Sequence, residues 1–586
     1  MRQWMVAAKK ADFYAIAEKF HVDPVVARII RNREVIGEKN IRIYLGGNLS
    51  DLSDPHQMKD MDRLVEILAQ KIRKQAHIRI IGDYDVDGVT SSHLFLTALR
   101  RVGAKVDVVI PHRIQDGYGL SLHLLQQAKE DGVDTILTCD NGIAAIDEIA
   151  WAKAQKMTVL VTDHHAVPFE EHEGRRTEKK SLADAVVNPH QQDCRYPYKE
   201  LCGAGVAWNV IRVLYENYDM DKREAEDLLD FVAMATVCDV MSLTGENRIL
   251  VKEGLKRIRH TKNIGLQALM QACNVQPENI SAYHFGYVLG PCVNATGRLD
   301  TARHALRLFE TGQETEAEEI ARDLVDLNQE RKELTLQGVE MAKKLCEEGG
   351  YEKDPVLVLF LPDVHESIAG LIAGRIREMY NRPVFVLTRG EEGVKGSGRS
   401  TENYSMYENM CGCAELFTKF GGHPMAAGLS LPEENVEKFR RKINENCPLT
   451  VEEVCPDIHI DMAMPVGYAS TELVHQFALL EPFGKDNPSP LFADRNLSIS
   501  RMWVIGKNRN VLRMSVLSEY GQPVPVIFFG DVETLFAYFT EKFGQEEVEN
   551  ALHGRKNRIL FSMVYTAKVD FYQGNENLQL EMKYYR

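Results

Sequence analysis

The chain has 586 residues, of which 44% are hydrophobic and 26% charged, a composition typical of a globular protein with about three or four domains. Its formal net charge of −15 argues against a protein that coats nucleic acid non-specifically, although it is compatible with a local basic channel. The N-terminal residues hold no apolar core long enough for a signal peptide, and no apolar run has transmembrane length. The eleven cysteines include no CxxC pair and no zinc-ribbon spacing, so we expect reduced thiols in a cytoplasmic protein that does not bind membranes.

Residues 1–60 are interpreted as a helical lead-in, which ends in a turn-rich patch at residues 48–55. From residue 61 to residue 255, short apolar runs alternate with helical runs. This alternation predicts a parallel sheet covered by helices. We expect the strands of this sheet at Ile78–Ile81, Val106–Ile110, Thr135–Cys139 and Thr158–Thr162.

An acidic loop follows the first of these strands. It carries carboxylates at alternate positions, Asp83, Asp85 and Asp87. Three like charges within five residues repel one another, so a bound cation explains them better than local stability does. The same spacing also opens a calcium-binding helix-loop-helix site, but that site needs a Glu at loop position twelve, where this chain has Leu94. The alternative that stays open is a solvated acidic turn.

Polar side chains also follow the other three predicted strands. The loop after the second strand contains Arg113 and Tyr118, the third strand leads to Asp140, and the fourth leads to the triplet at residues 163–165. Alone, an Asp after a strand is most often a helix N-cap. Because sites in such folds lie at the carboxyl ends of strands, we expect these groups to share one edge of the sheet. Asp239, at the end of a later helical run, adds one more carboxylate.

Four short motifs together resemble those of the DHH phosphoesterase family. They are Gly82–Gly88, Asp140–Gly142, Asp163–His165 and Cys238–Asp239. Within that family, further stretches are similar to the RecJ family of single-strand-specific exonucleases, namely Pro189, Tyr196–Leu201, Gly203–Ala207 and Gly290–Leu299. The chain departs from the RecJ pattern at Cys292, where an arginine is usual.

The middle of the chain continues this resemblance. Residues 300–348 have the pattern of long helices, which we interpret as a bridge between domains. A second α/β segment follows, with strands and a helix expected at Pro355–Phe360, Val384–Leu387 and Ser367–Tyr380. Its Gly-rich loop, Lys395–Ser400, and the stretch Gly421–Gly428 resemble the DHHA1 domain of the family, while Ser367 replaces a glycine that is usual in RecJ.

The last part of the chain is rich in short predicted strands. They lie at Leu497–Ile499, Val511–Leu517, Val524–Phe529, Ile559–Tyr565 and Leu578–Tyr584. Five short strands fit an OB-type β-barrel, and the preceding stretch resembles the junction into this barrel in RecJ, with Asp486 replacing a usual glycine. The candidates for binding nucleic acid are Trp503, Lys507, Arg509 and Arg513. Further aromatic candidates for base stacking are Phe528, Phe529, Phe571 and Tyr572, and the alternative for all of these rings is that they form barrel core.

The resemblance implies an α/β protein in which a parallel-sheet DHH domain is joined by long helices to a smaller α/β DHHA1 domain, followed by a C-terminal OB-type β-barrel. The expected domains are the lead-in at 1–60, the DHH catalytic domain at 61–255, a helical connector at 256–350, the DHHA1 substrate-binding domain at 351–452 and the OB-fold nucleic-acid-binding domain at 453–586.

The resemblance also implies a metal site. Oxygen ligands together with an imidazole suit Mn²⁺ or Mg²⁺ better than soft-ligand metals. By similarity to the family, two divalent cations are expected, one held by Asp83 and Asp85, the other by Asp87, His164 and Asp239, with Asp140 bridging both. Two cations about 3.5–4 Å apart lower the pKa of a shared water and stabilise the attacking and leaving oxygens of phosphoryl transfer. The expected catalytic residues are Asp140, Asp163, His164 and His165, with Asp163 orienting an imidazole and His165 donating to a phosphate oxygen.

Candidates for substrate binding lie in both α/β domains. They are Arg113, Tyr118, Arg298, His365, Arg375, Ser397, Arg399, Gly422 and His423. We predict that four of them hold the 5′ phosphate of the substrate, because guanidinium forks and hydroxyls suit phosphate. These four are Arg113, Tyr118, Ser397 and Arg399. The alternative for Arg113 is an ion pair with Asp116 in its own loop.

The function implied by the resemblance is that of a metal-dependent 5′→3′ exonuclease, which degrades single-stranded DNA to nucleotides in DNA repair and recombination. We expect a monomer, with a helicase and a single-strand-binding protein as candidate partners. Two alternatives are a DHH phosphodiesterase acting on short oligoribonucleotides or cyclic dinucleotides, and a non-catalytic DHH scaffold of the replication machinery. The complete carboxylate set weighs against the scaffold, and the predicted barrel weighs against the small-substrate enzyme.

Overall fold

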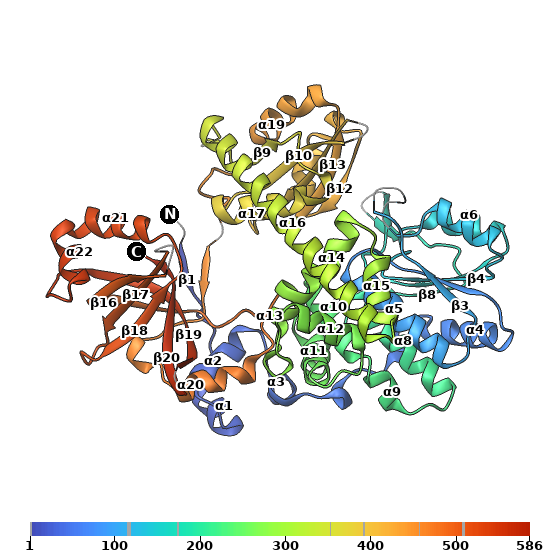
Figure 1. The fold of residues 1–586 in the computed structure, drawn as a ribbon, viewed down its shortest axis with the longest axis horizontal. Helices are drawn as coiled ribbons and strands as arrows, with labels where there is room; N and C mark the ends of the chain where they lie inside the picture. The colour runs from blue at the N-terminus through green and yellow to red at the C-terminus, as the bar shows by residue number, and fades with distance from the viewer. Residues whose placement is uncertain are drawn as a thin grey trace. The chain divides into compact units, whose positions relative to one another are not determined.

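The computed structural model describes residues 3–113, 116, 119–172, 175–351, 353–390, 393–455, 457–506, 510–572 and 574–586. The chain forms two compact units, whose elements are labelled in Figure 1. The first unit contains the described parts of residues 52–241 and 249–456. The second contains residues 3–51, residues 242–248 and the described part of residues 457–586. Within the described ranges, no helix is both long and apolar enough to cross a bilayer.

The first unit contains a five-stranded parallel sheet. Its strands in spatial order are β3 (Val106–Val109), β2 (Ile78–Ile81), β4 (Thr135–Cys139), β5 (Thr158–Thr162) and β8 (Ala185–Val187). Helices α6 (Leu122–Glu130) and α7 (Ile146–Ala154) cover one face, and α5 (Val86–Arg101) and α8 (Gly203–Asn217) cover the other (Figure 1). Burial on both faces explains why the strands are continuous apolar runs rather than alternating ones. The predicted parallel sheet is confirmed, with β8 as an additional strand.

The same domain contains smaller elements and the helices that carry the rest of the site. They are α4 (Met61–Arg73), β6 (Phe169–His172), β7 (Arg175–Glu178), α9 (Lys222–Glu226) and α10 (Leu229–Cys238). The helical segment that follows comprises α11 (Gly245–Ile258), α12 (Ile264–Ala272), α13 (Ala282–His284), the π-helical turn η4 (Phe285–Leu289), α14 (Gly290–Leu299), α15 (Arg303–Glu310) and α16 (Glu314–Glu348).

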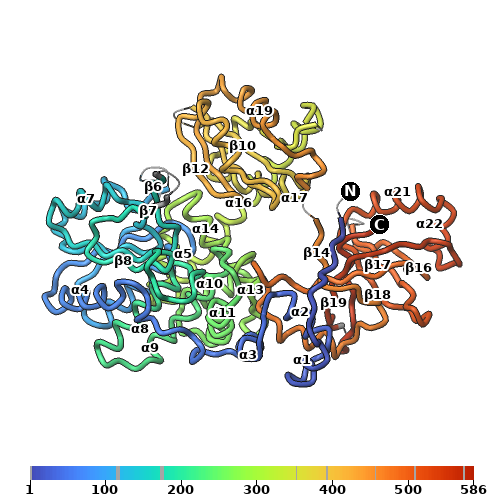
Figure 2. Tube along the Cα trace, turned by 180° about the vertical axis from the view of Figure 1, so that it is seen from behind, coloured from blue at the N-terminus to red at the C-terminus, as the bar shows by residue number. Residues whose placement is uncertain are grey.

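Helix α16 links the two α/β domains of the first unit, as the sequence predicts. It packs against α12 and α14 and also against α17 (Ala369–Tyr380) of the second domain. Figure 2 shows α16 and α14 from behind. Ala317 and Leu324 are buried in its first half, while Val339 and Ala342 in its second half belong to the core of the second domain. One helix of 35 residues therefore contributes to both domains.

The second domain is built on a five-stranded mixed sheet. Its strands in spatial order are β12 (Lys419–His423), β13 (Ala426–Leu431), β11 (Gly393–Arg399), β10 (Val384–Gly390) and β9 (Leu357–Phe360). Strands β9 and β10 are parallel, and the other pairs are antiparallel. Helices α16 and α17 pack on one face, whereas α18 (Met406–Cys411) and α19 (Val436–Glu445) pack on the other.

The prediction of a Gly-rich loop at Lys395–Ser400 is wrong, because most of this stretch is strand β11. Glycine is normally depleted in strands, but here it allows close packing. A Cβ at Gly396 would lie 2.4 Å from Cδ2 of Leu387, and one at Gly398 would lie 2.3 Å from Sδ of Met406. The glycines therefore accommodate neighbouring side chains within a sheet.

The second unit contains a closed β-barrel. Its strands are β16 (Phe492–Ile505), β17 (Val511–Leu517), β18 (Pro523–Phe528), β20 (Asn575–Tyr585) and β19 (Leu560–Tyr572), and β19 pairs back with β16. Helices α21 (Val532–Phe543) and α22 (Gln545–Leu552) connect β18 to β19. Full closure leaves none of these five strands as a free sheet edge. The predicted OB-type barrel is confirmed, and β16 is much longer than the expected strand at Leu497–Ile499.

The N-terminal segment belongs to this second unit. It contains β1 (Trp4–Val6), α1 (Phe13–Phe20), α2 (Pro24–Asn32) and α3 (Glu38–Gly46), and β1 pairs in parallel with β14 (Ile458–Ile460). Side chains of α2 share one hydrophobic core with the barrel, among them Val26, Ile29 and Ile30. Asp461 forms a buried ion pair with Arg33 at 2.7 Å. Helix α20 (Thr471–Phe477) packs into the same core.

Candidate active site

The carboxyl ends of three neighbouring parallel strands gather the acidic and imidazole groups. The acidic loop, residues 82–88, follows β2, Asp140 follows β4, and the triplet at residues 163–165 follows β5. Asp239 caps the C-terminus of α10. Since β2, β4 and β5 are adjacent, their ends bring these side chains to one edge of the sheet, as expected for a site in an α/β fold.

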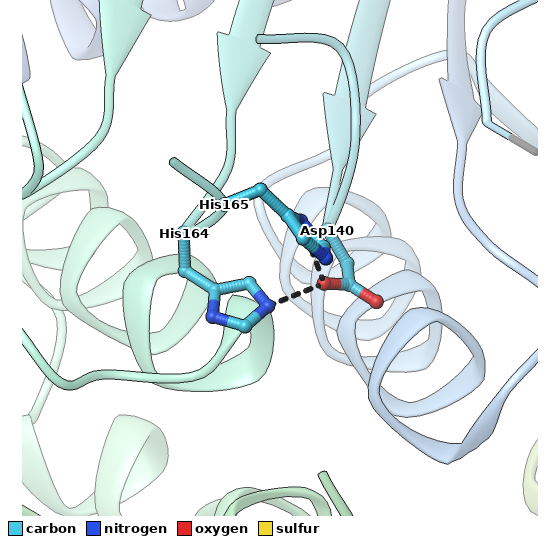
Figure 3. A group of neighbouring side chains, drawn as sticks. All are labelled: Asp140, His164 and His165. Carbon is cyan, nitrogen blue, oxygen red and sulfur yellow. Dashed lines mark ion pairs between the residues drawn. The ribbon is translucent and has the colours of Figure 1, made fainter. Parts of the chain in front are cut away.

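His164 lies at the centre of this group. Its Nε2 atom is 3.0 Å from Oδ1 of Asp140 and 3.6 Å from both Oδ2 of Asp87 and Oδ2 of Asp239. Figure 3 shows the rings of His164 and His165 directed at the Asp140 carboxylate. Three sets of side chains each place their ligand atoms within 4.8 Å of one another: Asp83, Asp85 and Asp140; Asp87, His164 and Asp239; and Asp140, His164 and His165.

The electrostatics of this group favour binding of a cation. Burial, followed by the charge of Asp85, raises the pKa of Asp83 well above its usual value. Burial and then the charges of Asp87 and Asp85 do the same to the pKa of Asp140, and burial lowers the pKa of His164. Among the described residues, Oδ1 of Asp83 is buried without a hydrogen-bond partner. Buried oxygens and an imidazole in this arrangement fit hard divalent cations.

The carboxylate of Asp87 is fixed by the start of α8. The backbone N–H groups of Gly203 and Ala204 donate to its two oxygens at 2.6 and 2.7 Å. A helix N-terminus stabilises negative charge through these amides and through its dipole. Sequence reasoning missed this contact because backbone amides leave no mark on a side-chain pattern. The only available signal was the small-residue run at the start of the helix.

Asp163 is a hydrogen-bond acceptor for its neighbours. Oδ1 accepts from the backbone N–H of His164 at 2.7 Å, and it lies 2.8 Å from Nδ1 of His165. Oδ2 accepts from the N–H of Ile143 at 2.9 Å. Burial alone would raise the pKa of Asp163, but the bonds with His165 bring it below its usual value. Burial opposes the charge on His165, and the bond to Asp163 outweighs it, so that the pKa of His165 is raised to about 9.

The unpredicted strand β8 adds a further residue to the edge of the site. Asn188 follows this strand, and its side-chain amide donates to the carbonyl oxygen of His165 at 2.9 Å. This bond fixes the backbone of the Asp-His-His triplet. A three-residue strand gives too short a pattern to be found from sequence.

A cavity of about 400 Å³ lies between the acidic loop and the second domain. Its lining includes Tyr84, Arg113, Ser367, Lys395, Ser397 and Lys419, and we call it the basic cavity. The guanidinium of Arg113 lies 4.9 Å from the centre of the Tyr84 ring. The predicted alternative for Arg113 is not found, because Asp116 contacts Nδ1 of His123 at 2.9 Å and accepts from the N–H of His112.

Two further arginines lie near this cavity. Burial, followed by the charges of Arg113 and Arg331, lowers the pKa of Arg298 to about 10. Burial and then the charge of Arg113 also lower the pKa of Arg399. Among the described residues no carboxylate pairs with these guanidiniums: Arg113 lies over the Tyr84 ring, and Arg298 and Arg399 donate to the backbone carbonyl oxygens of Ser367 and Gly398. Three neighbouring guanidiniums without acidic partners favour binding of an anion.

The remaining candidates are placed differently. His365 caps the turn before α17 and contacts the hydroxyl of Ser367 at 2.7 Å. Arg375 is 69% exposed and lies 3.7 Å from Glu378, so the structure does not bring it to the basic cavity. Gly422 and His423 lie on the exposed strand β12. Tyr118 lies outside the described residues.

In the barrel, Trp503 of β16 pairs across the ladder with Arg513 of β17. The guanidinium of Arg501 lies 5.6 Å from the Trp503 ring. Lys507 and Arg509 lie outside the described residues. Phe528 belongs to the barrel core, which is the alternative that the sequence left open for these aromatic side chains.

Comparisons with known proteins agree with this architecture. The family model "DHH family, N-terminal domain" matches residues 77–236, "DHHA1 domain" matches residues 353–447, and "RecJ OB domain" matches residues 460–584. The single-stranded-DNA-specific exonuclease RecJ of Haemophilus influenzae is 32% identical over 581 residues, which cover 96% of each chain. The chain belongs to the RecJ family.

Other RecJ proteins extend the comparison. RecJ of Bacillus subtilis is 33% identical over 512 residues, and the match spans 87% of this chain but only 63% of that protein. The crystal structure of Thermus thermophilus RecJ in complex with Mn²⁺ superposes with a TM-score of 0.81 at 25% identity, covering all of this chain and 79% of that one. The membership confirms the resemblance on which the expected fold was based.

The departures from the RecJ pattern have local structural explanations. Cys292, in place of the usual arginine, lies 3.8 Å from Sγ of Cys273 and accepts from Asn328 at 3.3 Å. Ser367, in place of glycine, contacts His365. Asp486 has a positive φ of 60°, a conformation that glycine adopts freely and that Asp tolerates better than most residues.

Proposed function

We propose that this protein is a metal-dependent exonuclease that hydrolyses single-stranded DNA from its 5′ end to nucleotides. The observation that carries the proposal is the cluster of five carboxylates and His164 at the strand ends, with the basic cavity in the same unit. This arrangement suits a nucleic-acid strand. Cations held by the carboxylates would stabilise the scissile phosphodiester, and the arginines would bind the terminal phosphate.

The donor set fits two divalent cations, for which we propose Mn²⁺ or Mg²⁺. Asp83 and Asp85 would hold one, Asp87, His164 and Asp239 the other, and Asp140 would contact both, since it belongs to groups on either side. When bound, the cations would activate water as a nucleophile and stabilise charge on the phosphoryl oxygens. Burial and mutual repulsion of the carboxylates support this assignment, because a buried cluster of like charges is stable only with a counter-charge.

We propose that His165 donates a hydrogen bond to a non-bridging phosphate oxygen. Its Nδ1 atom faces Asp163, which fixes the orientation of the ring. Because its pKa is raised to about 9, His165 carries a positive charge at neutral pH. Asp163 acts through His165 and through the backbone of the triplet, so it is a positioning residue.

The basic cavity is proposed to bind the 5′ phosphate and so set the direction of degradation. Arg113 and Ser397 line it, and Arg399 lies beside Ser397, with Nη1 3.3 Å from its hydroxyl. Arg298 ties this region to the connector by donating from Nη1 to the carbonyl oxygen of Ser367 at 2.7 Å. Tyr118 is included in the proposal on its place in the sequence alone.

The barrel is proposed to hold the rest of the strand. Trp503 offers a ring for base stacking beside Arg501 and Arg513, whose charges suit the backbone phosphates. We also propose a cytoplasmic monomer acting in DNA repair and recombination, with a helicase and a single-strand-binding protein as partners. All eleven cysteines are free, which agrees with a reducing compartment.

The decisive experiment uses the pure protein with Mn²⁺ or Mg²⁺ on end-labelled single-stranded DNA, duplex DNA and RNA dinucleotides. We expect mononucleotides released from the 5′ end of single strands and little cleavage of blunt duplex. Preferential hydrolysis of RNA dinucleotides would favour the small-substrate alternative. Binding of single strands without any hydrolysis in either metal would favour the non-catalytic scaffold.

A further inference from the structure

Two exposed tyrosines form a stacked pair on the connector. The rings of Tyr283 on α13 and Tyr287 on η4 have centroids 5.1 Å apart and an interplanar angle of 22°. Their side chains are 62% and 72% exposed. Large rings left in water contribute little to folding, and paired exposed aromatics often mark a binding surface. The pair also lies at a π-helical turn. Such turns are rare in proteins, and those that occur are often found at functional sites.

The helix that carries these tyrosines packs directly against the candidate metal site. Segments α13, η4 and α14 follow one another without a break from residue 282 to residue 299. The thiol of Cys238, which precedes Asp239, donates to the carbonyl oxygen of Phe285 at 3.3 Å. A Cβ at Gly290 would lie 2.3 Å from the Cys238 sulfur. The buried face of this helix therefore supports the turn that carries Asp239.

The same helix then reaches the acidic loop. The side-chain oxygen of Asn294 accepts from the backbone N–H of Val86 at 3.2 Å. Asn294 is seven residues after Tyr287 and eleven after Tyr283 on this continuous helical segment. At a rise of no more than about 1.5 Å per residue, the tyrosines are up to about 10 and 16 Å from Asn294 along the axis. At about 3.4 Å per stacked nucleotide, that corresponds to roughly three to five nucleotides.

We propose that Tyr283 and Tyr287 form a stacking platform for bases of the single strand, roughly three to five nucleotides to the 3′ side of the scissile phosphate. The inference rests on the proposed function and adds to it a base-binding surface outside the barrel. Tyrosine rings stack on all four bases, so the platform holds the strand without selecting sequence. It would position the strand for cleavage while the metal-site residues carry out the chemistry.

The first test compares substrate lengths. We expect the double variant Tyr283→Ala/Tyr287→Ala to lower kcat/KM on a 5′-phosphorylated 20-mer by at least about fivefold and up to about a hundredfold. On a dinucleotide it should stay within about twofold of the wild type, because a dinucleotide is too short to reach the platform. The variant Tyr283→Phe/Tyr287→Phe keeps both rings and should match the wild type at every length. The control is Tyr14→Ala, which removes another tyrosine that is 79% exposed.

A second test does not depend on hydrolysis. In Ca²⁺ or EDTA, 5-iododeoxyuridine placed at successive positions of a single strand should photocrosslink to Tyr283 or Tyr287 only at about the third to fifth nucleotides. If the wild-type protein crosslinks at these positions but cleaves no substrate, the stacking platform is supported and the proposed function is overturned. If the wild-type protein cleaves normally but forms no crosslinks, and the double variant loses no more activity on the 20-mer than on the dinucleotide, the stacking platform alone is overturned. An equal loss of activity on the 20-mer and the dinucleotide would also overturn it, since that result indicates damage to the metal site.

Discussion

The backbone N–H of Gly203 donates to the carboxylate of Asp87 at 2.6 Å, so the first turn of α8 fixes a candidate metal ligand that lies more than a hundred residues earlier in the chain. The contact requires the helix to approach closely. A Cβ at Gly203 would lie 2.6 Å from Cβ of Asp140 and 3.0 Å from its Cα. A residue without any ligand atom therefore holds two of the candidate ligands in place.

Substitution of Gly203 should disrupt the metal site without removing a ligand. In Gly203→Ala the added methyl must displace Asp140 or α8, so we expect Mn²⁺ affinity and hydrolysis to fall at least about tenfold, with a loss of roughly 1–3 kcal/mol in stability. Calorimetric titration with Mn²⁺ and thermal unfolding measure the two effects. The matched control is Gly205→Ala in the same helix, where the nearest side-chain atom would be 3.4 Å away. Equal metal affinity in both variants would contradict the argument.

Asp140 is proposed to contact both cations, so its charge should have opposite effects on the metal-free and metal-loaded protein. Asp140→Asn removes one negative charge from a buried acidic cluster, and Asn tolerates the positive φ of 62° at this position. We expect a higher Tm than the wild type in EDTA, a lower Tm in excess Mn²⁺, and loss of hydrolysis by at least about a hundredfold. A variant that cleaves at near wild-type rate would remove Asp140 from the two-cation proposal.

Much of the candidate site was predictable because strand ends and carboxylates are visible in sequence. The buried strands β2, β4 and β5 are continuous apolar runs, and the side chains that follow them meet as expected. Arg375 illustrates what was not predictable, since its motif position does not reveal that its side chain faces solvent beside Glu378. The contact of Gly203 with Asp87 depends on backbone geometry, which a side-chain pattern does not encode.

The basic cavity predicts a dependence on the 5′ phosphate. Arg399→Ala should slow cleavage of 5′-phosphorylated strands far more than cleavage of 5′-hydroxyl strands, because the lost guanidinium has no phosphate to bind in the latter. Single-turnover rates on the two substrates give the comparison. Arg389→Ala serves as the control, since Arg389 lies in the same domain but pairs with Glu433 at 3.1 Å on the surface. If Arg399→Ala slows cleavage of both substrates equally, the basic cavity does not set the direction of degradation.

A buried carboxyl outside the site predicts a pH dependence of stability. Burial raises the pKa of Asp230 to about 6, although it accepts hydrogen bonds from Thr261 and from the N–H of Phe231. Because the folded pKa is above the unfolded one, the favourable contribution of Asp230 is complete below about pH 4 and is lost as the pH rises through 6. Asp230→Asn removes this titration and should gain stability relative to the wild type between pH 4 and 7, by roughly 3 kcal/mol at the upper end.

Thermal unfolding at successive pH values tests this prediction, and EDTA keeps both proteins free of metal throughout. The difference in stability between Asp230→Asn and the wild type should be small at pH 4 and largest above pH 7. A constant difference across this range would show that folding does not raise the pKa of Asp230.

The fold was less predictable where segments distant in sequence meet. The α/β alternation and the barrel strands follow from local periodicity, and both are present. Strand β11 was missed because its glycines read as a loop. The packing of α2 on the barrel joins residues more than four hundred positions apart, for example Asn32 and Asp461, and no local pattern reports such a contact.

The shared core of the N-terminal helices and the barrel has a consequence for the order of synthesis. Residues 3–51 leave the ribosome well before the barrel does, and the apolar side chains of α2 have their partners after residue 457. At about 5–20 residues per second, they wait on the order of 20 to 80 s, while the intervening DHH and DHHA1 domains already have their own cores. These helices are therefore made long before they can be buried, and during that interval their exposed apolar faces are available to chaperones and to other nascent chains.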